Sequence, residues 1–160
     1  MNWKEAFLRQ AFSDFEVHEE LARLQLPSCH ELLYLQMAVE KLGKYYLAPH
    51  DGTKPKLTHK SIVKGLKITA NNADTRQKLG YPSHKDYQQK LKRINSVAQW
   101  LEDLYPTSDD NAPNAKYPWS DVSSAVTAPC DVEFHEQVSM HQLKEFRAFI
   151  RSILRAESTD

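Results

Sequence analysis

The sequence predicts an all-α protein, an up-and-down bundle of about five helices with one long irregular loop before the last helix. Three observations support this fold. Five segments repeat apolar residues at the spacing of an amphipathic helix. The 160 residues include only four glycines, too few for the many tight turns of a β-sandwich. No segments with strand character alternate with the helical ones, so we expect no parallel sheet.

The length and composition predict a single domain over residues 1–160. The hydrophobic fraction of 41% and the charged fraction of 26% are typical of globular proteins. The first ten residues lack a signal-peptide core and no run of 18 apolar residues occurs, so we expect neither export nor membrane insertion. Cys29 and Cys130 show neither a disulfide framework nor metal-ligand spacing, which favours a reduced, cytoplasmic setting.

The first two helices are expected at residues 2–24 and 28–47. Pro27 separates them, because a proline disfavours helical backbone at the residue before it. In the second helix, Ser28 is followed three residues later by Glu31. This pattern predicts a capping box, in which each side chain bonds to a free main-chain N–H at the start of the helix.

Two more helices are expected in the middle of the chain, at residues 58–70 and 83–105. Thr58 can cap the first of them, and Ser83 with Asp86 can form a capping box for the second. The connection between them is expected to contain a short turn of helix.

The last part of the chain differs in character from the helical segments. Residues 106–133 contain four prolines, many polar residues and little periodicity, which predicts a long loop that is functional or partly disordered. A last helix is expected at residues 135–156. Its inward residues are predicted to be Phe146, Phe149, Ile150 and Ile153. Its outward arginines are predicted to be Arg147, Arg151 and Arg155.

The formal net charge is zero, but the charges are unevenly distributed. Residues 54–93 hold 11 Lys and Arg against 2 Asp and Glu, a net charge of +9. Residues 1–53 hold 5 Lys and Arg against 8 Asp and Glu, and residues 94–160 hold 5 Lys and Arg against 11 Asp and Glu. A basic segment between acidic flanks can attract an anion such as a nucleic acid or a nucleotide. Alternatively, it pairs with those flanks, or with an acidic partner.

The sequence lacks the short motifs of several enzyme classes. No Walker A loop, no Gly-x-Ser-x-Gly and no Gly-x-Gly-x-x-Gly occurs. The seven histidines show no pair with zinc-ligand spacing, and no cysteine pair assists them. We therefore expect no metal and no cofactor, and we assign no catalytic residue.

A stripe of lysines is the strongest candidate for phosphate contact. Lys60, Lys64 and Lys67 recur on one outward side of the predicted helix at residues 58–70, with His59 near its start. Phosphate contact needs several cations in one patch with few carboxylates nearby. The alternative is a solvated helix face, with His59 serving only to cap or pack.

Part of the sequence resembles the HEPN-domain family. "LQMAVEKLGKYYL" is similar to the signature second helix of these domains, and its matching residues are Gln36, Ala38, Glu40, Lys41 and Lys44. "LTHKSIVKGL" supplies the Thr-His start of the next helix with Thr58 and His59. "NAKYPW" resembles the Arg-Tyr-Pro segment before the last helix, with Lys116 and Tyr117. The three matches follow the family's order.

The resemblance implies a bundle of four to five helices that often forms a homodimer. HEPN proteins include metal-independent ribonucleases of toxin and defence systems. They also include non-catalytic modules that bind nucleotides or pair with a nucleotidyltransferase. The ribonucleases carry Arg-x(4–6)-His, a spacing that Arg23 and His30 satisfy. Because this pair precedes the signature helix and spans a proline, we interpret the match as accidental.

The sequence therefore predicts a small HEPN-like protein that binds RNA or a nucleotide through a basic surface, in a toxin–antitoxin or defence system. Two alternatives stay open: a metal-independent ribonuclease, and a non-catalytic interaction module paired with a nucleotidyltransferase. A homodimer is expected. The candidate binding residues are Lys44, His59, Lys60, Lys64, Lys67, Lys116 and Tyr117.

Overall fold

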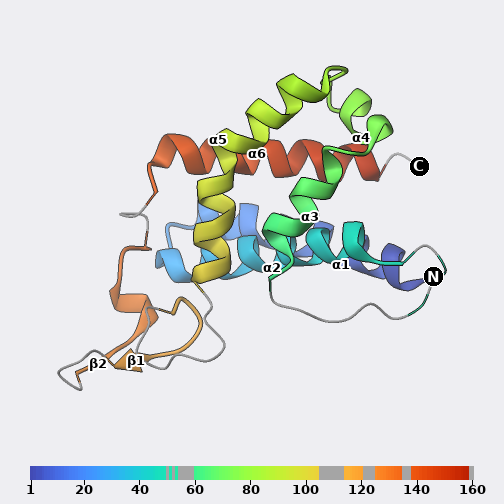
Figure 1. Cartoon of the computed structure of the whole chain (residues 1–160). Coiled ribbons are helices and arrows are strands. Elements are labelled where there is room, and N and C mark those ends of the chain that lie inside the picture. The colour runs from blue at the N-terminus through green and yellow to red at the C-terminus, as the bar shows by residue number, and fades with distance from the viewer. Residues whose placement is uncertain are drawn as a thin grey trace.

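The computed structural model describes residues 1–49, 51, 53, 60–104, 114–120, 125–134 and 138–158. Within these ranges the chain forms six α-helices, one antiparallel pair of short strands and one 3-10 helix (Figure 1). The predicted all-α bundle is confirmed. None of the described helices is long and apolar enough to cross a membrane.

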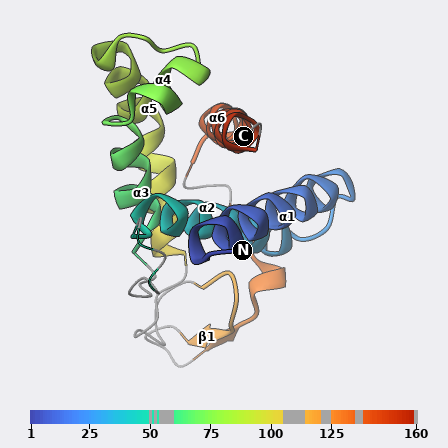
Figure 2. The same ribbon diagram turned by 90° about the vertical axis from the view of Figure 1, so that its right-hand side faces the viewer.

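The first two helices, α1 (Trp3–Arg23) and α2 (Ser28–Leu47), have the predicted bounds to within one residue. A capping box starts α1: the Asn2 side chain accepts from the main-chain N–H of Glu5 at 2.9 Å, and the Glu5 carboxylate accepts from that of Asn2 at 3.0 Å. The two helices lie side by side in both views (Figures 1 and 2).

The predicted capping box at the start of α2 is wrong. Pro27 is the N-cap, and no side chain caps the helix. The Ser28 hydroxyl donates instead to the carbonyl of Val132 at 3.4 Å and accepts from the N–H of Phe134 at 3.3 Å. Glu31 pairs with Arg147 at 2.5 Å. Tertiary contacts have taken both groups that the local pattern assigned to the cap.

The third helix is shorter than predicted. It starts at Ile62, as α3 (Ile62–Thr69), and Thr58 lies outside the described residues. Ser61 is the N-cap but its side chain does not cap; its hydroxyl donates to the main-chain carbonyl of Glu40 at 3.1 Å. The connection that follows holds the short helix α4 (Ala73–Lys78), which confirms the expected turn of helix.

The last two long helices differ only in detail from the helices predicted at residues 83–105 and 135–156. Ser83 caps α5 (His84–Asp103), and its hydroxyl accepts from the N–H of Asp86 at 3.4 Å, which is only one half of the predicted capping box. The helix α6 (Met140–Glu157) begins later than residue 135, with a capping box of Ser139 and Gln142. The predicted inward residues of this helix are buried. Of the predicted outward arginines, Arg155 is exposed, whereas Arg147 and Arg151 are partly buried and form ion pairs.

The described parts of the predicted loop contain little regular structure. Strands β1 (Trp119–Ser120) and β2 (Val126–Thr127) pair antiparallel, and the 3-10 helix η1 (Pro129–Asp131) follows. The ring of Trp119 lies 6.0 Å from that of Phe134. This contact anchors the segment to the bundle.

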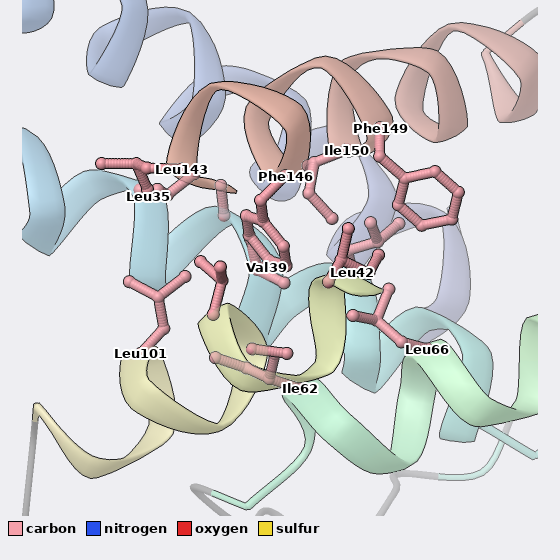
Figure 3. Packing of buried hydrophobic residues seen from close by; sticks show 14 of the residues in the cluster. Leu35, Val39, Leu42, Ile62, Leu66, Leu101, Leu143, Phe146, Phe149 and Ile150 are labelled. Atoms are coloured by element: carbon pink, nitrogen blue, oxygen red, sulfur yellow. The ribbon is translucent and has the colours of Figure 1, made fainter. Parts of the chain in front are cut away.

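The hydrophobic core surrounds α2. Leu35, Val39 and Leu42 of this helix point toward residues of α3, α5 and α6 (Figure 3). Those partners are Ile62, Leu66, Leu101, Leu143, Phe146, Phe149 and Ile150. Burial of each such side chain stabilises the fold by about 1.5–3 kcal/mol. The core therefore fixes α3 and α5 relative to each other.

Candidate functional site

Two glycines bring α3 against α2. A Cβ at Gly65 would stand 2.9 Å from the carbonyl oxygen of Gly43 and closer still to its Cα. A Cβ at Gly43 would likewise collide with the main chain of Ser61. Only glycine permits this close approach of two backbones. The crossing sets the position of α3 beside α5.

A groove with a volume of about 520 Å³ lies between α3 and α5. It is lined by Lys67, Ala70, Asn71, Gln88, Leu91, Lys92 and Asn95. Lys67 lies in the last turn of α3, and Ala70 and Asn71 directly follow that helix. The other four residues follow helical spacing along one face of α5. The two helices thus contribute the walls of one site.

The lining is cationic, rich in amides and free of carboxylates among the described residues. Lys67 and Lys92 supply the charge, one from each helix. Leu91 and Ala70 supply apolar surface. A carboxamide group both donates and accepts hydrogen bonds, and so do the edges of nucleic-acid bases. The arrangement suits a ligand that joins phosphates to a flat polar base.

The two groove lysines are exposed, and neither forms an ion pair with any described residue. The other side of α5 is different. There Lys90 pairs with Glu145 of α6 at 2.7 Å, and Arg93 approaches the same carboxylate at 3.5 Å. A hydrogen bond from Lys90 lowers the pKa of Glu145. The acidic partner of α5 thus lies on the side facing α6.

The structure brings only one of the described candidate residues into this groove, namely Lys67. Lys64 is exposed on α3, and Lys60 is exposed just before that helix. Lys116 and Tyr117 are exposed in the segment before β1, with the Lys116 Nζ 5.2 Å from the tyrosine ring centre. None of these four lines the groove.

The two remaining candidate binding residues are His59 and Lys44. His59 lies outside the described residues. Lys44 is 11% exposed and pairs with Glu40 on α2. Its ammonium group is therefore engaged within the protein.

The other residues that match the HEPN signature are also engaged inside the bundle. Gln36 and Glu40 are buried, and the Gln36 Nε2 donates to the Glu40 carboxylate at 3.1 Å. Lys41 reaches the buried Asp14 of α1 at 3.6 Å. Lys41 therefore joins α2 to α1, whereas Gln36 and Glu40 bond to each other within α2, and none of the three lines the groove.

The sequence interpretation missed Asn71, Gln88, Lys92 and Asn95. Lys92 was recognisable as part of a basic surface on the predicted helix at residues 83–105. The spacing of Gln88, Lys92 and Asn95 places them on one helical face. Which face meets α3, however, depends on the glycine crossing, which no local pattern reveals.

A buried histidine lies on α1. His18 is 1% exposed, and its Nδ1–H donates to the main-chain carbonyl of Glu31 at 2.8 Å. Burial, chiefly, lowers the pKa of His18 to about 4, against the opposing effect of that hydrogen bond. A histidine held neutral in this way contributes to packing.

The residues of the spacing match to the ribonuclease motif lie on the surface. Arg23 pairs with Glu20 at 2.5 Å, and His30 is exposed. Among the described residues, no group of three or more His, Cys, Asp or Glu side chains is placed to hold a metal ion.

Comparison with known proteins adds no relative, since no family model, no curated protein and no solved structure matches the chain. The groove between α3 and α5 and its lining residues are therefore the basis for a functional proposal.

Proposed function

We propose that this protein binds a nucleotide unit, either free or within single-stranded RNA, in the groove between α3 and α5. The observation that carries the proposal is the pair of exposed lysines, Lys67 and Lys92, in a lining without carboxylates. Lysines that contact phosphates release condensed counterions, which supplies affinity independent of sequence.

The remaining lining residues suit the base and sugar. Asn71, Gln88 and Asn95 offer amides that can hydrogen-bond to base edges. Leu91 provides an apolar surface for the face of a base. The volume of about 520 Å³ falls within the range of about 300–1,000 Å³ typical of small-ligand sites.

The HEPN resemblance supports the same ligand class, since non-catalytic members of that family bind nucleotides. The signature helix forms over the expected residues. By the same resemblance, we propose a cytoplasmic homodimer that acts beside a nucleotidyltransferase in a toxin–antitoxin or defence system. Sedimentation at micromolar concentration tests the dimer, and a monomer would contradict it.

A ligand screen by thermal unfolding tests the binding proposal. The probes are ribonucleoside monophosphates, ribonucleoside triphosphates and short single-stranded RNA. A ligand at 100 times its dissociation constant stabilises the folded state by about 2.7 kcal/mol. We expect stabilisation of the unaltered chain and its loss in Lys67→Gln/Lys92→Gln. Stabilisation that persists in the double variant would place the ligand elsewhere.

The same preparation separates binding from cleavage. Labelled RNA incubated with the protein and a chelator is expected to stay intact. Cleavage without metal would favour the ribonuclease alternative.

A further inference from the structure

The only two cysteines of the chain are distant in sequence but lie on two elements that contact each other in the fold. Cys29 is buried in the first turn of α2, and Cys130 is exposed in η1. The 3-10 helix contacts α2 directly. The Ser28 hydroxyl fixes this contact through its hydrogen bonds to Val132 and Phe134.

Cys130 also acts electrostatically on Cys29. Burial raises the pKa of Cys29, and Cys130 is the next largest cause of that rise. The main-chain N–H groups of Cys29 and His30 act in the opposite direction. The buried thiol is therefore held protonated, and the exposed thiol is the one that a reagent in solution can reach.

We propose that Cys130 and Cys29 form a thiol-oxidation site, in which Cys130 reacts first with a low-molecular-weight disulfide and Cys29 completes an internal disulfide. The site is independent of the groove between α3 and α5. It requires only a low-molecular-weight disulfide such as glutathione disulfide, which is the electron acceptor.

The reaction proceeds by two exchanges. The Cys130 thiolate attacks one sulfur of glutathione disulfide, whose S–S bond breaks and releases one glutathione thiolate, which takes up a proton. Cys29 then loses its proton and its sulfur attacks the Sγ of Cys130, displacing the second glutathione. Two protein thiols are oxidised to one disulfide, and one glutathione disulfide is reduced to two glutathione molecules.

The product would tie η1 to the start of α2. Because the two cysteines are far apart in sequence, the bond would close a long loop and restrict the unfolded chain. It would also hold the neighbouring segment of β1 and β2 to the bundle. Oxidation is thus expected to raise the unfolding temperature of the full chain, and reduction to restore it.

Mass spectrometry after incubation with glutathione disulfide tests the proposal. The unaltered chain should lose two hydrogen atoms and both alkylatable thiols, and dithiothreitol should reverse both changes. Cys29→Ser should stop at a mixed disulfide and gain one glutathionyl group. Cys130→Ser should retain its thiol under the same conditions.

Three outcomes would overturn the proposal. The first is a stable glutathionyl adduct on the unaltered chain while Cys29 stays reduced. The second is a disulfide between two chains through Cys130. The third is oxidation of Cys130→Ser at the rate of the unaltered chain. Circular dichroism of each variant confirms folding, and Cys130→Ser, altered at an exposed position, keeps the test valid if Cys29→Ser does not fold.

Discussion

Lysines occur in two regions of this protein, on α2 and at the groove, in opposite circumstances. On α2, Lys44 is largely buried and pairs with Glu40, while Lys41 reaches the buried Asp14. At the groove, Lys67 of α3 and Lys92 of α5 are exposed and form no ion pair with the described residues. The sequence alone placed lysines of both kinds among the candidate binding residues.

This difference shows that partners, rather than residue type, decide what a charge does. A buried ion pair keeps both charges compensated, and loss of one member leaves the other charge without compensation. An exposed lysine without a partner adds little to stability but can contact an anion from solution. Substitutions at the two regions should therefore affect different quantities.

The largest expected effect is the removal of the buried carboxylate. Glu40→Ala leaves the Lys44 ammonium and the Gln36 amide without their shared partner. We expect the free energy of unfolding to fall by about 3–5 kcal/mol. Urea denaturation measures this change. Glu40→Leu/Lys44→Leu should cost less, because it leaves no lone charge, and equal costs would contradict this interpretation of the pair.

The buried histidine should make stability depend on pH. The pKa of His18 is about 4 in the folded protein, against an ordinary value of 6.5. Between pH 4 and 6.5 the unfolded chain therefore binds a proton that the folded chain does not. The contribution of neutral His18 to the free energy of unfolding is fully present above pH 6.5 and is lost as the pH falls toward 4. The loss approaches about 3 kcal/mol.

The environment of His18 includes Glu31, Arg147 and Glu19, which also influence its pKa. His18→Asn retains a donor toward the Glu31 carbonyl but cannot titrate. Comparison of the two unfolding curves between pH 4 and 7 isolates the histidine. Identical pH slopes would show that other groups cause the effect.

The close approach of α2 and α3 at Gly43 and Gly65 should affect both the stability of the fold and binding at the groove. Gly65→Ala forces α3 away from Gly43, and we expect a loss of about 1–3 kcal/mol in unfolding free energy. Ligand binding should weaken as well, because Lys67 moves with α3. Gly80→Asn is the control: its backbone is left-handed at φ +76°, with open space around an added Cβ. A stable Gly65→Ala variant with unchanged binding would contradict the role of the crossing.

The groove lysines should have the smallest effect on stability. Lys67→Gln/Lys92→Gln is expected to change the free energy of unfolding by less than about 0.5 kcal/mol. Glutamine has a helix propensity close to that of lysine, so the helix content should remain. A loss above about 1 kcal/mol would show that these lysines balance acidic residues within the fold.

Local patterns predicted most of the fold. Apolar periodicity and Pro27 placed α1 and α2 almost correctly, because those signals depend on neighbouring residues. The errors arose where a polar side chain serves a distant partner. The Ser28 hydroxyl, predicted to cap α2, bonds instead to Val132 and Phe134.

The groove could be predicted only in part for the same reason. Lys67 followed from the basic stripe, but its partner Lys92 belongs to a helix whose orientation depends on non-local contacts. Those contacts include the Lys90–Glu145 pair and the close approach at Gly43. Lys44 shows the converse error. Glu40 lies four residues before it, a spacing that allows the two side chains to pair on one helix face, and in the fold this pair engages the Lys44 ammonium group.

The most direct measurement is the salt dependence of RNA binding by two charge-matched variants. Fluorescence anisotropy with a short single-stranded RNA gives the logarithm of affinity against that of salt concentration. The variants are Lys67→Gln/Lys92→Gln and, as control, Arg9→Gln/Lys144→Gln, which removes two exposed positive charges from α1 and α6. We predict that the groove variant binds at least about tenfold more weakly and has a slope flatter by about 1.4, two contacts at about 0.7 each. The control should keep the slope of the unaltered chain. Equal slopes and affinities for both variants would contradict binding in the groove.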